Sequence, residues 1–121
     1  LVGSEMCIRD SLQTIMAGLA CGEPNTISFD ILKNHTSFFV SAPDWVSEKG
    51  MRMLGAPLKG DPQVVSGESG AVAMGLVATV MQDPDYQELR EALQLDETSN
   101  VLMFSTEGDT DPDNYKKILW R

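Results

Sequence analysis

The sequence is poor in the residues that most often ligate metals or cross-link a fold. It has 121 residues, of which one is histidine and two are cysteine, and aromatic side chains make up only 7%. A single histidine, His35, excludes a histidine-based metal cluster within the chain, so we expect no metal site. Cys7 and Cys21 stand in no metal-ligand spacing and follow no secretory signal pattern, which favours a reducing, cytoplasmic location.

Basic residues and long hydrophobic runs are also scarce. Nine Lys and Arg stand against 18 Asp and Glu, which gives a net charge of −9. This balance repels a phosphate backbone, so we expect no nucleic-acid partner. The longest apolar run, residues 71–81, is shorter than the roughly 20 residues of a membrane helix, so we expect no membrane partner. The absence of G-x-G-x-x-G and G-K-[ST] leaves dinucleotide and P-loop sites without support.

The two ends of the chain look unlike its interior. Residues 1–11 show neither strand nor helix periodicity and resemble a translated sequencing adapter, although an ordinary frayed terminus would look similar. We exclude them from the fold prediction and expect one unit over residues 12–121. The chain stops at Arg121 directly after an apolar run, so we expect a fragment of a longer protein.

Short apolar runs alternate with helical patterns along the chain. Strands are predicted over residues 37–42, 63–66 and 100–104. Five helices are predicted. The first follows a cap at Ser28, and the second begins at Pro43 with an inward stripe of Trp45, Val46, Met53 and Leu54. The third spans residues 70–82 after a cap at Ser69, and the last two span residues 86–95 and 113–120. Because strands that alternate with helices form parallel sheets, we expect an α/β fold, a three-layer parallel sheet with helices on both faces.

The predicted helix over residues 70–82 is apolar on nearly every face, which is typical of a helix buried on all sides. Three short strands and a few helices cannot surround such a helix. We therefore expect its cover to come from sequence upstream or from a partner subunit.

Two loops lie where the predicted parallel sheet would bind ligands, at the carboxyl ends of strands. In the loop 66–70, backbone N–H groups at a helix N-terminus suit an anion, although Ser69 there would serve equally as a helix cap. The loop 105–111 carries hydroxyls and carboxylates that suit a polar ligand, or that cap the following helix.

Three segments together resemble the pyridoxal-phosphate enzymes of the tryptophan synthase β and threonine dehydratase fold type. Residues 14–20, T-I-M-A-G-L-A, are similar to the S-I-S-A-G-L-D of that family. Residues 67–72, G-E-S-G-A-V, resemble its E-S-S-H-A and E-P-S-G-A segments, and residues 105–111, S-T-E-G-D-T-D, resemble its S-G-R-G-D-K-D. The three segments stand in the family's order and on the expected elements.

When these segments are read with the residues on either side of them, their sequences resemble those of the 2,3-diaminopropionate ammonia-lyases within that fold type. The resemblance extends from Leu12 onward and covers only the C-terminal part of such an enzyme. It implies pyridoxal 5′-phosphate as cofactor and an α,β-elimination that converts 2,3-diaminopropionate to pyruvate and ammonia. It also implies an amino-acid substrate, a place in amino-acid catabolism and a homodimer for the full-length enzyme.

Motif matching carries four cofactor-binding residues onto this chain: Gly18, Glu68, Ser105 and Thr106. The resemblance implies that Gly18 lies against the cofactor ring and that Ser105, or Thr106 beside it, faces the pyridine nitrogen. Glu68 would orient the substrate or lie near the ring hydroxyl. No lysine of this chain stands in a family motif, so we expect the Schiff-base lysine upstream and assign no catalytic residue here.

Two alternatives stay open. A threonine or serine dehydratase of the same fold type would carry similar loops, although dehydratases favour S-G-G-N wording in place of C-G-E-P-N and S-T-E-G-D-T-D. An acidic α/β interaction module without catalysis would instead concentrate its distinctive residues on an exposed apolar patch.

Overall fold

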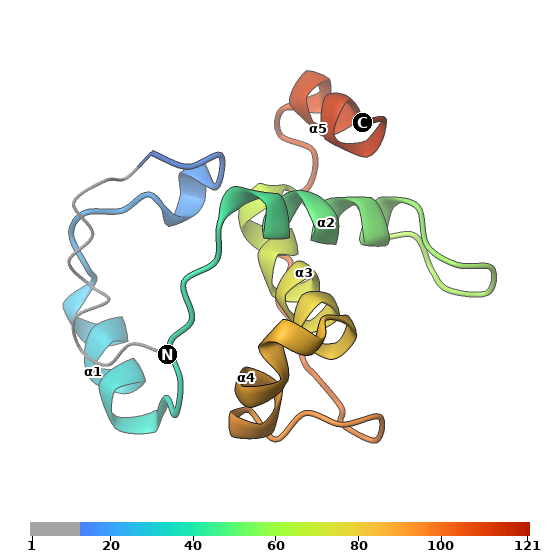
Figure 1. Cartoon of the computed structure of the whole chain (residues 1–121). Coiled ribbons are helices and arrows are strands. Elements are labelled where there is room, and N and C mark those ends of the chain that lie inside the picture. Colours follow the sequence, from blue (N-terminus) through green and yellow to red (C-terminus); the bar gives the residue numbers. More distant parts are fainter. Residues whose placement is uncertain (1–12) are drawn as a thin grey trace.

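The computed structural model describes residues 13–121, so the predictions for residues 1–11 and for Cys7 lie outside the described residues. The regular elements in this part of the chain are helices. In chain order they are η2 (Ala17–Leu19), α1 (Thr26–His35), α2 (Asp44–Gly55), α3 (Glu68–Gln82), η3 (Pro84–Tyr86), α4 (Gln87–Ala92) and α5 (Pro112–Leu119) (Figure 1). None of the helices over 13–121 has the length and hydrophobicity needed to cross a membrane.

The predicted three-layer parallel sheet is wrong, because residues 13–121 contain no strand. A strand forms only where its N–H and C=O groups pair with a neighbouring strand. The N–H of Val64 donates instead to the carbonyl of Leu54 in α2, at 2.9 Å. Residues 37–42, 63–66 and 100–104 thus have a local preference for extended backbone, but no adjacent strand in residues 13–121 pairs with them.

The helices α2 and α3 cross in backbone contact at two glycines (Figure 1). A Cβ on Gly50 would lie 2.0 Å from the carbonyl oxygen of Ala71, and a Cβ on Gly75 would lie 1.8 Å from that of Val46. No side chain longer than hydrogen fits at either position. The crossing therefore depends on both glycines.

The inward face of α2 differs from the predicted stripe. The helix buries Val46, Ser47, Gly50, Met51 and Gly55. Trp45 is 46% exposed, and Met53 and Leu54 are only half-buried. The stripe is confirmed at Val46 and wrong at Trp45, because the small residues Ser47 and Gly50 allow the close approach of α3 and turn that face of the helix inward.

The core lies where α2, α3 and α5 meet. Met51, Ala71 and Ile118 form the buried cluster, one residue from each helix, and Ile15 and Leu54 pack against it. On α3 itself the buried residues are Gly70, Ala71, Gly75, Ala78, Thr79 and Val80. The remaining α3 side chains are half-buried or exposed, so within residues 13–121 the expected burial on all sides is not reached.

The helix starts also differ from the predicted caps. Asn25, and not Ser28, caps α1, since its side chain accepts from the Ser28 N–H at 3.0 Å. The N-cap of α3 is Gly67, which has no capping side chain, so Ser69 lies inside the helix and does not cap it. The predicted helix 86–95 is shorter than expected and begins after η3.

Candidate functional site

The three segments that carry the family resemblance meet at the N-terminus of α3. A Cβ on Gly18 would lie 2.9 Å from Ser69 Oγ, which places the segment 14–20 against the first turn of α3. A Cβ on Gly70 would lie 3.2 Å from the backbone nitrogen of Thr106, which places the loop 105–111 against the same turn. Residues far apart in sequence are thus brought to one place.

The segment 14–20 is held by the first residue of α2. Thr14 Oγ1 donates to Asp44 Oδ1, and the Ile15 N–H donates to Asp44 Oδ2 at 3.2 Å. The segment then turns through η2, which contains Gly18. A cavity of about 250 Å³ adjoins it, bordered by Met16, Leu19 and Val72 among others. The position of Gly18 therefore depends on the start of α2.

The turn before α3 is fixed by hydroxyl groups. Ser66 is fully buried, and Ser105 Oγ donates to Ser66 Oγ at 2.9 Å. Ser47, also fully buried, donates from its hydroxyl to the carbonyl of Glu68. Both contacts tie the turn to another element, one to the loop 105–111 and one to α2.

The four predicted site residues do not all face one another. Ser105 and Thr106 lie together beside Gly70, and Gly18 lies on the side of Ser69. The carboxylate of Glu68 is directed to α5, because Asn114 Nδ2 donates to Glu68 Oε1. Glu68 is thus placed between the start of α3 and the start of α5, and one of its carboxylate oxygens is engaged by Asn114.

Residues at this site that motif matching did not single out are Ser66, Ser69 and Glu107, which lie in the two predicted ligand loops, and Asp44 and Asn114, which lie outside them. Ser69 Oγ is buried next to Gly18 and has no hydrogen-bond partner among the described residues. Glu107 lies within the S-T-E-G-D-T-D wording, which was the available signal for it. Asp44 and Asn114 had no signal, because their partners are far away in the sequence.

The residues present fit a cofactor with hydrogen-bonding groups better than a metal ion. The hydroxyl of Ser105, the backbone of Thr106 and the unpartnered hydroxyl of Ser69 lie at the first turn of α3. That turn also presents the positive end of the helix dipole. Over the described stretch 13–121, no group of three or more His, Cys, Asp or Glu could hold a metal ion. Of the lysines, Lys49 donates to Thr79 Oγ1 at 3.3 Å, away from the motif residues.

Near this site, α5 carries one perturbed acid. The pKa of Tyr115 is raised above its ordinary value of 10.0, first by burial and second by the negative charge of Asp109. Its hydroxyl is buried without a hydrogen-bond partner. Tyr115 therefore stays neutral and serves the packing of α5 on α2.

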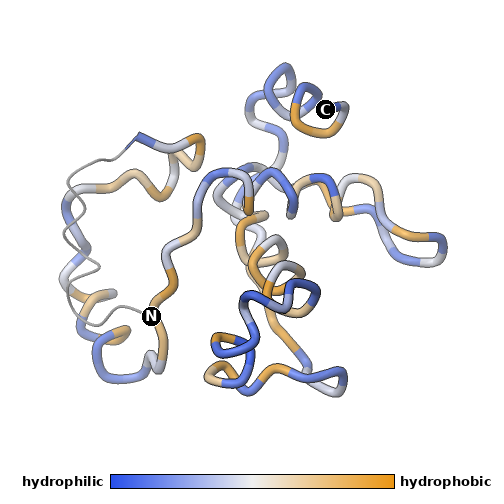
Figure 2. The backbone as a smooth tube through the Cα atoms, viewed as in Figure 1, coloured by the Kyte–Doolittle hydropathy of each residue, from blue (hydrophilic) through white to orange (hydrophobic). Residues whose placement is uncertain are grey.

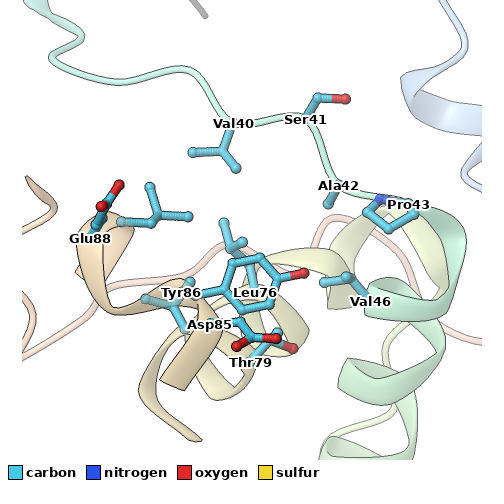
Figure 3. Close-up of a pocket in the computed structure, with 12 residues that line it drawn as sticks. Val40, Ser41, Ala42, Pro43, Val46, Leu76, Thr79, Asp85, Tyr86 and Glu88 are labelled. Atoms are coloured by element: carbon cyan, nitrogen blue, oxygen red, sulfur yellow. The ribbon is translucent and has the colours of Figure 1, made fainter. Parts of the chain in front are cut away.

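A larger cavity, of about 510 Å³, lies elsewhere in the molecule. It is bordered by the segment 40–43, by Val46 of α2, by Leu76 of α3 and by Tyr86 and Glu88 near α4 (Figure 3). None of the four predicted site residues borders it. We therefore place the candidate site at the N-terminus of α3 and not in this cavity.

Comparisons with known proteins identify similar chains. No protein-family model matches the sequence. The chain is 50% identical over 119 residues to the diaminopropionate ammonia-lyase of Salmonella typhimurium strain LT2, and 47% identical over 118 residues to that of Escherichia coli K12. Each match covers 98% of this chain and 30% of the relative. The chain thus spans about a third of the length of the curated relatives it matches.

Solved structures of the Escherichia coli diaminopropionate ammonia-lyase are similar in three dimensions. A crystal structure in complex with an aminoacrylate-PLP azomethine reaction intermediate superposes with a TM-score of 0.84 at 50% identity, covering 88% of this chain and 28% of that one. A complex with D-serine superposes with a TM-score of 0.80 at 48% identity, covering 85% of this chain and 26% of that one. The predicted resemblance to these lyases is therefore confirmed.

Proposed function

We propose that this chain is a section of a pyridoxal-phosphate-dependent diaminopropionate ammonia-lyase, which performs an α,β-elimination on 2,3-diaminopropionate to give pyruvate and ammonia. Sequence identity of 50% along nearly the whole chain supports this proposal. The structural observation that carries it is the meeting of three family-like segments at the N-terminus of α3. On this proposal residues 12–121 form the C-terminal part, and the Schiff-base lysine lies in the remainder of the enzyme.

Pyridoxal 5′-phosphate supplies, when bound, the electron sink that the elimination needs, and the protein orients and tunes it. Among this chain's residues, Ser105 is proposed to contact the pyridine nitrogen, with Thr106 as the neighbouring alternative. A hydroxyl is a neutral partner and does not hold that nitrogen protonated as a carboxylate would. Ser66 Oγ lies 2.9 Å from Ser105 Oγ, and when the single Ser105 proton is donated to the nitrogen, Ser66 can donate to Ser105 in return and hold that hydroxyl in place.

Gly18 and Glu68 complete the proposed set. A Cβ at Gly18 would lie 2.9 Å from Ser69 Oγ, so a side chain there would require the Ser69 hydroxyl to move. Glu68 is held by Asn114, which fixes one of its carboxylate oxygens and leaves the other to orient the substrate or the ring hydroxyl. The unpartnered Ser69 hydroxyl next to Gly18 supports a polar ligand at this point.

We propose further that the full-length enzyme is a homodimer that acts in cytoplasmic amino-acid catabolism. A small, charged amino-acid substrate fits such a location. Light scattering on the full-length protein would measure the dimer directly.

The test of the proposed function is a product assay on the full-length protein. Pyruvate is followed from 2,3-diaminopropionate, with serine and threonine as control substrates. Pyruvate from diaminopropionate alone supports the lyase. Turnover of threonine or serine alone would assign the chain to the dehydratases, and a protein with neither product nor cofactor absorbance would contradict both.

Ser105→Asp tests the proposed contact with the pyridine nitrogen. A carboxylate there should stabilise the protonated form of that nitrogen, shift the cofactor absorbance and change the partition between elimination and side reactions. Glu97→Asp, an exposed position away from the site, serves as the control variant. An unchanged spectrum and rate in Ser105→Asp would remove Ser105 from the site.

A further inference from the structure

We propose that Glu107 is a positioning residue that fixes the loop 105–111 on the N-terminus of α3 and thereby places Ser105 and Thr106 for the cofactor. This inference rests on the proposed function. Glu107 has no role among the residues that motif matching carried over. Its contacts, however, join the two segments on which the proposed site depends.

The helix α3 begins without a cap of its own. Its N-cap residue is Gly67, which has no side chain to accept from the first N–H groups of the helix. Such N–H groups are normally satisfied by a Ser, Thr, Asp or Asn at the cap. The start of α3 therefore needs an acceptor from elsewhere in the chain.

Glu107 supplies that acceptor twice. Its carboxylate oxygen Oε1 accepts from the Ser69 N–H at 3.0 Å, and its backbone carbonyl accepts from the Gly67 N–H at 3.1 Å. The first contact joins residues 38 positions apart. A negative charge at this point is also favoured by the helix dipole. One residue of the loop thus takes the place of the missing cap.

The absence of a side chain at Gly67 leaves the space that Glu107 occupies. A Cβ at Gly67 would lie 2.7 Å from Glu107 Cγ and 2.7 Å from the carbonyl oxygen of Gly108. The residue that would normally carry the cap is therefore one that leaves room for Glu107. The missing cap and the tight fit are two separate observations, and both indicate that the loop is built onto this helix.

Ser105 and Thr106 directly precede Glu107, so the tie determines where they lie. Ser105 is otherwise held by its hydrogen bond to Ser66, and Thr106 passes beside Gly70. Because the Glu107 carboxylate is engaged by Ser69, it acts on the cofactor only through the residues it places. A hydrogen bond from a hydroxyl group weakens steeply as its distance grows and its angle bends, so small movements of the loop 105–111 affect the bonds that Ser105 and Thr106 can make to the cofactor.

The experiment compares Glu107→Ala, Glu107→Gln and the control Glu97→Ala in the full-length enzyme. In the cofactor-free protein we expect the Ser69 amide of Glu107→Ala to exchange hydrogen about fivefold faster, as for the loss of a helix cap. In the loaded enzyme we expect a shifted cofactor absorbance and a lower kcat with KM little changed. Glu107→Gln keeps an acceptor oxygen and should restore most of both properties, and Glu97→Ala should match the wild type.

Unchanged Ser69 exchange or unchanged cofactor absorbance in Glu107→Ala would overturn the inference. If Glu107→Ala does not fold, Glu107→Asp carries the same test, because its carboxylate is one methylene too short to reach Ser69. A wild-type enzyme without cofactor absorbance or product contradicts the proposed function itself. If the wild type is active and Glu107→Ala has the same Ser69 exchange and cofactor absorbance as the wild type, only the positioning role of Glu107 is contradicted.

Discussion

Two glycines, Gly50 and Gly75, determine how closely α2 and α3 approach. Glycine inside a helix ordinarily costs about 1 kcal/mol relative to alanine, so replacement by alanine usually stabilises. At these positions the methyl group would meet backbone atoms at 2.0 Å and 1.8 Å. Backbone cannot move aside as a flexible side chain does, so the packing outweighs the helix propensity.

Gly50→Ala is therefore expected to lower the free energy of unfolding by about 3 kcal/mol. Chemical denaturation of the full-length protein measures the change. Gly108→Ala is the matched control, because nothing lies within 4 Å of a Cβ there. A Gly50→Ala protein as stable as the control would show that the helices separate at little cost.

Tyr115 carries a buried hydroxyl without a partner, and leaving such a group unsatisfied is unfavourable. Tyr115→Phe should raise the free energy of unfolding by about 1 kcal/mol at neutral pH. Because the folded state raises the pKa of Tyr115 above 10.0, it favours the neutral phenol. The stability from this group is present below pH 10 and is lost as the pH rises through the folded-state pKa.

Denaturation from neutral pH to about pH 11 measures both effects on Tyr115. The decrease in the free energy of unfolding at alkaline pH should be smaller in Tyr115→Phe than in the wild type. Tyr86→Phe, at a tyrosine that is 37% exposed, controls for the removal of a phenol. If the wild type and Tyr115→Phe lose the same free energy of unfolding at alkaline pH, that loss comes from other groups.

Among the elements, α2 organises the site although none of the four predicted site residues belongs to it. Its first residue, Asp44, holds Thr14 and Ile15, and Ser47 one turn later holds the carbonyl of Glu68. Its glycine face fixes α3. Both the segment with Gly18 and the first turn of α3 are therefore aligned by a single helix.

Asp44→Ala should release the segment 14–20 and leave α2 formed. We expect the Ile15 amide to exchange hydrogen about tenfold faster, since its acceptor is a charged group. Asp113→Ala, which removes an exposed acid from the first turn of α5, controls for the lost interaction with a helix dipole. If the Ile15 amide is equally protected in both variants, Asp44 is not what holds the segment.

At the scale of the whole molecule, several large apolar side chains are exposed. Ile27 of α1 is 73% exposed, Leu102 is 81% exposed and Phe104 is 75% exposed. Figure 2 shows apolar stretches along the outlying parts of the trace, and α1 has no buried residue. Exposed apolar area on this scale marks surfaces that contact other protein. The proposal that the chain is a section of a longer enzyme accounts for them.

The 121-residue chain expressed alone is expected to bind a hydrophobic dye such as ANS and to self-associate. The full-length enzyme should bind far less dye per mole, because it covers these side chains. Dye fluorescence and light scattering measure the two properties. A monomeric short chain without dye binding would show that the apolar segments find cover within the chain itself.

The helices could be predicted from the sequence, and the sheet could not. Residues 70–82 and 113–120 were predicted as helices, and the structure has α3 and α5 within two residues of those bounds. Helical periodicity is a local property, so a short window suffices to detect it. A strand needs a partner, and the three predicted strands lack one in residues 13–121. The cap at Ser28 was wrong because α1 begins earlier, where Asn25 accepts from the Ser28 N–H, and the cap at Ser69 was wrong because α3 begins earlier and its acceptor is the distant Glu107.

The sequence by itself determined the family resemblance, because segments 14–20, 67–72 and 105–111 carry the motifs and a motif is read without the fold. It also determined which residues are small enough for close contact. Only the tertiary structure decided that Asp44, Glu107 and Asn114 hold those segments, since each of these residues bonds to a partner at least 29 positions away. Local preference acts over a few residues, whereas a hydrogen bond between distant segments exists only after the helices have packed.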